Sequence, residues 1–112
     1  MCRGQAGDVQ AYKKDTAAVN GLLRITNKIL NPDTAIVLFD SAYKLSKEAN
    51  YADGAFIALI TKGIKYFEKQ DYENYRSVSY EALKWAEKST QPDAVAWSLI
   101  NIGEAWFSEG DW

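Results

Sequence analysis

The chain has 112 residues, 47% of them hydrophobic and 25% charged, with a net charge of −2. This is the composition of one folded domain rather than a disordered chain. The 13 basic and 15 acidic residues are interspersed, which argues against a nucleic-acid-binding patch. No apolar run approaches the roughly 18 residues of a membrane span. The absence of histidine removes the commonest general base and metal ligand, so we expect neither an enzyme nor a cofactor.

The N-terminal part predicts one long helix over about residues 9–30, where apolar residues recur at helical spacing. Asn20-Gly21 is a turn signal that can kink it. Before this helix stands the single cysteine, Cys2, which has no partner for an internal disulfide. Two interpretations of Cys2 stay open. It is either a terminal cysteine without a role or the acylated cysteine of a lipoprotein whose signal segment was removed before Met1. The compartment is therefore open, with the cytoplasm favoured over a periplasmic or lipid-anchored location.

Four further helices are predicted over about residues 33–49, 52–69, 72–88 and 92–109. Pro32 and Pro92 stand where the first turn of a helix tolerates proline. The helix at 52–69 is apolar on two sides, which indicates contact with more than one neighbour, or with one neighbour and a ligand. No segment shows the sustained alternation of a strand, so the prediction is an all-α fold of about five helices forming one domain over residues 1–112.

The chain nearly repeats itself after 40 residues, when residues 52–72 are compared with residues 92–112. A fixed period in this range is typical of stacked helical repeats. Glycine inside a helix costs about 1 kcal/mol relative to alanine, yet it recurs at the same repeat position. We therefore expect close helix contacts at both glycines. Six positions are identical in the two segments: Asp53/Asp93, Leu59/Leu99, Ile60/Ile100, Gly63/Gly103, Phe67/Phe107 and Asp71/Asp111.

This repeat resembles the tetratricopeptide repeat, a family of antiparallel helix pairs. The resemblance covers about residues 31–112 and is carried by a glycine, an aromatic residue three positions later, an acidic–aromatic turn and small residues in the second helix. The period is 40 residues rather than about 34, as in longer-helix variants, and Lys62 and Tyr75 depart from the usual pattern. The matching residues are Gly63, Tyr66, Asp71, Tyr72 and Ala82, then Gly103, Trp106, Asp111 and Trp112, with Ala35, Phe39 and Ala42 in the preceding second helix.

The resemblance implies a right-handed α-solenoid whose first helices line a concave, partner-binding groove. Its apolar lining argues against the family's clamp for a C-terminal carboxylate and favours a helix or an apolar peptide. For Ile57, Ile60 and Ile64 a core position is an equally open interpretation, because an interior repeat helix touches several neighbours. The groove positions implied are Ile57, Ile60, Ile64, Phe67, Trp97, Ile100, Glu104 and Phe107.

The expected function is a protein–protein interaction scaffold, forming the beginning of a longer array in a larger bacterial regulator. The chain stops just after a turn that normally leads into another helix. The alternative is a stand-alone helical adaptor or oligomerisation module. Because the helix at 92–109 is apolar on several sides, we also expect a homodimer through this helix, centred on Trp106 or Trp97.

Overall fold

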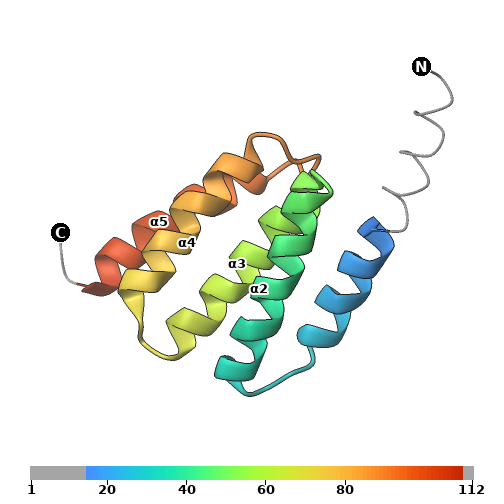
Figure 1. Cartoon of the computed structure of the whole chain (residues 1–112). Helices are drawn as coiled ribbons and strands as arrows, with labels where there is room; N and C mark the ends of the chain where they lie inside the picture. The colour runs from blue at the N-terminus through green and yellow to red at the C-terminus, as the bar shows by residue number, and fades with distance from the viewer. Residues whose placement is uncertain (1–14, 110–112) are drawn as a thin grey trace, which may run out of the picture.

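The computed structural model describes residues 15–109, which form five helices and no strand. The helices are 15–26, α2 (Pro32–Glu48), α3 (Ala52–Glu68), α4 (Tyr72–Ala86) and α5 (Ala94–Glu109). Figure 1 shows them side by side in chain order, each running antiparallel to the one before. Every labelled helix packs against the next, and α3 also touches α5. The predicted all-α class is confirmed.

Three helix boundaries differ from the expected positions by two or more residues, and one of them is the end of α4, which lies at Ala86 rather than at residue 88. The first helix ends at residue 26, where a turn follows, and it runs through Asn20-Gly21 without interruption. Its expected part before residue 15 lies outside the described residues. The last helix begins at Ala94 rather than at Pro92, because Pro92 and Asp93 form a turn.

Helices α2 and α3 end in the same type of C-terminal cap. Asn50 and Gln70 follow the two helices in left-handed conformations, with φ of 52° and 60°. The next amide returns to the last turn in each case: Tyr51 N donates to Ser46 O at 2.8 Å and Asp71 N to Tyr66 O at 2.9 Å. This is the Schellman arrangement, which satisfies carbonyls that the helix leaves free. Each following helix therefore turns back along its predecessor.

The starts of α2 and α4 are capped by side chains. The Asn31 side chain accepts a hydrogen bond from Thr34 N at 3.0 Å, and the Asp71 side chain accepts one from Asn74 N at 3.3 Å. Such caps satisfy amide groups that have no partner within the first turn of a helix.

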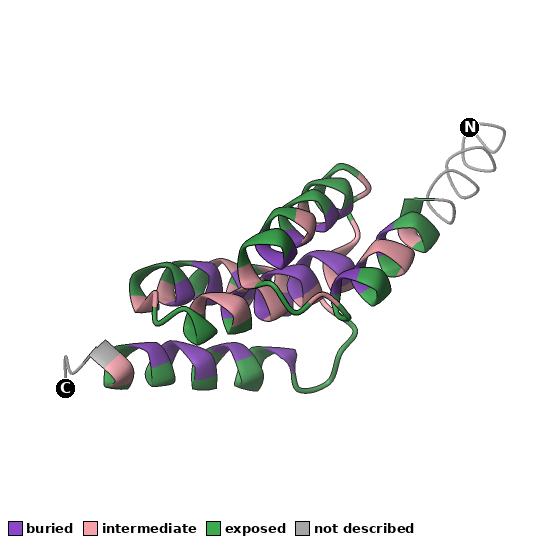
Figure 2. Cartoon of the chain, turned by 90° about the horizontal axis from the view of Figure 1, so that it is seen from below, coloured by how far each residue is buried: buried purple, intermediate pink, exposed green. Residues whose placement is uncertain are grey.

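The core consists of two clusters that meet at α3. One joins the helix 15–26 to α2 and to Ala58 of α3, and the other joins α3 to α4 and to Ala94 at the start of α5. Helix α3 is thus covered on opposite sides by α2 and α4. Figure 2 shows that α5, at the C-terminal end, is buried along one side only. The second cluster contains Phe56, Leu59, Ile60, Val78, Ala82, Ala86 and Ala94.

Gly63 lies at the close contact between α3 and α4. A Cβ at this position would lie 3.2 Å from both Tyr75 Cδ1 and Val78 Cγ2, which is tighter than an ordinary van der Waals contact. The missing side chain therefore lets α4 approach α3, as the repeat predicted. Gly103 does not follow this prediction, because nothing lies within 4 Å of its Cβ position.

The start of α3 is tied to the loop between α4 and α5. The Asp53 carboxylate accepts hydrogen bonds from Ser89 Oγ at 2.5 Å and Thr90 N at 2.7 Å, and a further one from the Thr90 hydroxyl. Burial raises the pKa of Asp53, but the hydrogen bonds from Ser89 and Thr90 lower it by more, so the pKa lies below its ordinary value. The ionised carboxylate thus helps to fix the loop that leads into α5.

Candidate protein-binding surface

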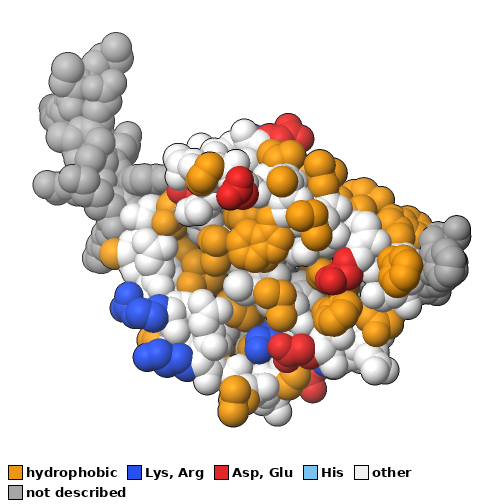
Figure 3. Space-filling model, turned by 180° about the vertical axis from the view of Figure 1, so that it is seen from behind, with side chains coloured by type: hydrophobic (Ala, Val, Ile, Leu, Met, Phe, Trp, Pro, Cys, Tyr) orange, Lys and Arg blue, Asp and Glu red, His pale blue; other side chains and the backbone are white. Residues whose placement is uncertain are grey.

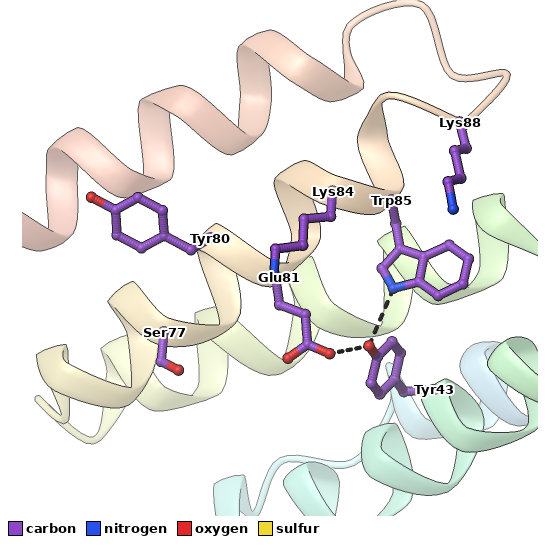
Figure 4. Close-up of a pocket in the computed structure, with 7 residues that line it drawn as sticks. All are labelled: Tyr43, Ser77, Tyr80, Glu81, Lys84, Trp85 and Lys88. Carbon is purple, nitrogen blue, oxygen red and sulfur yellow. Dashed lines mark hydrogen bonds between the residues drawn. The ribbon is translucent and has the colours of Figure 1, made fainter.

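A hollow with a volume of about 420 Å³ lies between α2 and α4. In Figure 4 the Tyr43 hydroxyl donates a hydrogen bond to Glu81 and accepts one from Trp85 Nε1, at 3.2 Å in the second case. Burial, followed by the hydrogen bond to Glu81, raises the pKa of Tyr43 to about 12, so the phenol stays neutral. These hydrogen bonds join α2 to α4, and each of these helices is the second helix of its repeat. The lining residues are Tyr43, Ser77, Tyr80, Glu81, Lys84, Trp85 and Lys88.

No arrangement in residues 15–109 points to a metal ion, because no three acidic, cysteine or histidine side chains gather as ligands there. Charged residues that depart from the repeat pattern have structural partners. Lys62, which stands where an apolar residue is usual, has a side chain only 14% exposed and forms an ion pair with Asp40 of α2.

The α3 residues expected in the groove fall into different environments. Ile60 is 1% exposed and packs in the cluster with Val78 and Ala82, which is the core position that the sequence left open for it. It belongs to the core because α4 covers its side of α3. Ile57 is half-buried between the two clusters, whereas Ile64 is 41% exposed.

Phe67, the last of the expected α3 residues, lies against α4. Its ring makes edge contacts with Tyr72 and Tyr75, at centroid distances of 5.7 and 5.3 Å. Although 37% of Phe67 remains exposed, its position is fixed by these rings. The α3 residues expected in the groove therefore come from two sides of the helix, one that meets α4 and one that faces solvent.

Two of the expected α5 residues contact the rest of the chain. The Trp97 ring meets Phe56 edge-on at 5.9 Å between centroids and is 42% exposed. Glu104 accepts a hydrogen bond from the Tyr75 hydroxyl at 2.6 Å. Burial and then this bond raise the pKa of Tyr75. These two residues lie along the seam between α5 and the preceding helices.

The other two, Ile100 and Phe107, are each 66% exposed. Their repeat counterparts, Ile60 and Phe67, meet α4. Residues 40 apart occupy the same side of corresponding helices, so Ile100 and Phe107 lie on the side of α5 that corresponds to the α4-covered side of α3. We call this side the open face of α5, formed by Leu99, Ile100, Gly103, Trp106 and Phe107.

Identical residues have very different exposure on the covered and the open face. Leu59 and Ile60 are each 1% exposed, whereas Leu99 is 53% and Ile100 is 66% exposed. Gly63 contacts α4, whereas Gly103 faces open space. Figure 3, which views the molecule from behind, shows hydrophobic side chains spreading over this side towards the C-terminal end. The open face therefore has the composition of a helix–helix interface without a covering helix in the described structure.

Trp106 is held in place at the edge of the open face. Its Nε1 donates a hydrogen bond to the Tyr80 hydroxyl at 3.1 Å, and the Arg76 guanidinium lies 4.1 Å from the ring centroid. The expected dimer contact was centred on Trp106 or Trp97, and the α4 partners of Trp106 were not predicted.

No family model, curated protein or solved structure matches the chain. None of the helices within residues 15–109 combines the length and the apolar character needed to cross a bilayer. The role of the open face is therefore argued from its own geometry.

Proposed function

We propose that this chain is a protein-interaction module that binds a segment of another polypeptide through the open face of α5. The observation that carries the proposal is the contrast between the covered pair Leu59 and Ile60 and the exposed pair Leu99 and Ile100. Fully burying a side chain of this size contributes about 1.5–3 kcal/mol. A partner that covers both residues gains a substantial part of its binding free energy from them.

Charge favours an apolar partner. The open face itself contains no charged side chain, and α5 carries only two charged residues, Glu104 and Glu109. At the edge of the face, Arg76 lies over the Trp106 ring, and Glu104 accepts the hydrogen bond from Tyr75. Hydrophobic burial is therefore the main source of affinity, and these edge groups contribute mainly to orientation.

We further propose that the module is a long-helix relative of the tetratricopeptide repeats and acts as a scaffold within a larger regulator. Support comes from the 40-residue period, the antiparallel helix order and the glycine contact between α3 and α4. The alternative is an oligomerisation module in which a second copy covers the same face. It is favoured by the lack of like charges that would repel two copies of the open face.

Site-specific photo-crosslinking in the native host tests the function. A photoreactive residue replacing Ile100 should give a discrete adduct with another protein. The matched control replaces Val37, which is 63% exposed on α2, almost as much as the 66% of Ile100. No adduct at position 100, or the same adducts at both positions, would refute the proposal. An adduct with a second copy of the chain would favour the oligomerisation alternative.

A further inference from the structure

The two helix pairs in the described chain differ in which helix carries the larger side chain at two corresponding repeat positions. In the first pair the corresponding repeat positions hold Leu23 and Ala35, which lie in one buried cluster together with Phe39 and Ala42 of α2. Forty residues later the first helix has Gly63, and the residue facing it is the large Tyr75. Each pair thus has one large and one small residue at these two repeat positions, and the larger one changes helix, which conserves the volume that the two positions fill.

The third first-helix position is Gly103, and no atom fills the space above it. By the same rule, the side chain that belongs there is large and resembles Tyr75. Apolar side chains flank this space on both sides, as an aromatic ring would require. Leu99 lies one turn earlier, and Trp106, one turn later, is fixed by Tyr80 and Arg76.

We propose, building on the interaction function above, that the open face of α5 binds an amphipathic helix from a partner protein, with an aromatic ring seated over Gly103. The template for this helix is α4, whose buried stripe covers the corresponding side of α3. The stripe is uncharged and consists of an aromatic residue, a β-branched residue three positions later and small residues beyond it. Its members are Tyr75, Val78, Ser79, Ala82 and Ala86.

A second copy of the chain does not present such a stripe in its described part. The buried side of α4 is occupied by α3, and the corresponding side of α2 is buried as well. In the open face of another copy the aromatic residues Trp106 and Phe107 follow the aliphatic residues along the helix, whereas in the template the aromatic residue comes first. A helix from a different protein therefore satisfies the pattern without unfolding either partner.

A third feature supports a helix followed by a polar turn. Asp53, at the start of α3, binds Ser89 and Thr90 in the loop after the covering helix α4. Asp93 occupies the corresponding position before α5, and its side chain is exposed. It can accept hydrogen bonds from a Ser-Thr turn that follows the docked helix.

A tethered probe tests the inference on the full chain. A copy of residues 73–90 is appended directly after Trp112, so that Asp111-Trp112 precede it as Asp71-Tyr72 precede the original. Urea titration followed by circular dichroism then compares the extended and the unextended chain. The folding equilibrium constant should rise at least tenfold, because the copied helix buries Leu99 and Ile100.

Size-swapped variants make the test specific for Gly103. In the extended chain, Gly103→Leu should remove the gain, and so should alanine in place of the copied tyrosine. The two changes together should restore most of it, because they reproduce the Leu23 and Ala35 pair. In the unextended chain Gly103→Leu should not lower stability, because it points into open space.

Three results would overturn the inference: no gain from the extension, a gain that Gly103→Leu leaves unchanged, or an α5-to-α5 dimer that persists in the extended chain during sedimentation. Failure here is distinguishable from failure of the interaction function. A crosslinked partner at position 100 without any gain from the extension would keep the function and reject the helical occupant. A gain without a crosslinked partner would show that the face accepts a helix but would reject the interaction with another protein.

Discussion

Gly63 and Gly103 occupy the same repeat position in different surroundings, so replacing each by leucine separates packing from helix propensity. At Gly63 a new Cβ would lie 3.2 Å from Tyr75 Cδ1 and Val78 Cγ2, and the rest of a leucine side chain would have to displace α4. At Gly103 nothing lies within 4 Å. Both substitutions gain about 0.8 kcal/mol, because glycine is a poor helix former. Only Gly63→Leu carries the overpacking cost of about 1–3 kcal/mol.

Because the propensity gain is common to both variants, the difference between their free energies of unfolding isolates the packing cost. Gly103→Leu should be slightly more stable than the parent chain, and Gly63→Leu less stable than Gly103→Leu by about 1–3 kcal/mol. With urea m-values of about 1–3 kcal/mol per M, their midpoints should differ by roughly 1 M. Equal midpoints, measured by circular dichroism, would refute the assignment of Gly63 to a tight helix contact.

Three further predictions concern the turns and the link between α2 and α4. Gln70→Gly should raise the unfolding free energy by about 0.5–1 kcal/mol in a urea titration, because glycine adopts the left-handed conformation at φ of 60° without strain; a loss would contradict the cap described here. Tyr43→Phe should cost about 1 kcal/mol, since it removes the hydrogen bonds to Glu81 and from Trp85, and a thermal melt identical to that of the parent would argue against this link. For Asp53 the folded-state pKa is depressed, so its stabilising effect should be complete above the ordinary value of 3.8 and lost as the pH falls through the lower folded value. The stability difference between the parent and Asp53→Asn should shrink over that range in pH-dependent urea titrations, and a constant difference would exclude the carboxylate as its cause.

The helices and their order were accessible from sequence, because apolar spacing and capping residues act locally. Asn31 and Asp71 cap helices in the structure, and Gly63 indicated the close contact that the structure shows between α3 and α4. The start of α5 was predicted two residues too early, because a proline is compatible with either a first helical turn or a preceding turn.

The binding surface was only partly predictable, because periodicity shows that a side of a helix is apolar but not what covers it. Ile60 and Ile100 are the same residue in the same local sequence, yet one is in the core and the other is exposed. Their difference is set by the presence or absence of a neighbouring helix. The hydrogen bond from Trp106 to Tyr80 joins residues 26 positions apart, and no local pattern encodes it.

The one-sided packing of α5 has a consequence for hydrogen exchange. Helix α3 contributes to both core clusters, so its amides exchange only when most of the fold opens. Helix α5 is buried along one side only, and its local opening exposes far less apolar surface. Its amides should therefore exchange through fraying at the lowest free energy among α2 to α5. A partner bound to its outer side would suppress this local opening. Amide protection in α5 is therefore a sensitive reporter of a bound partner.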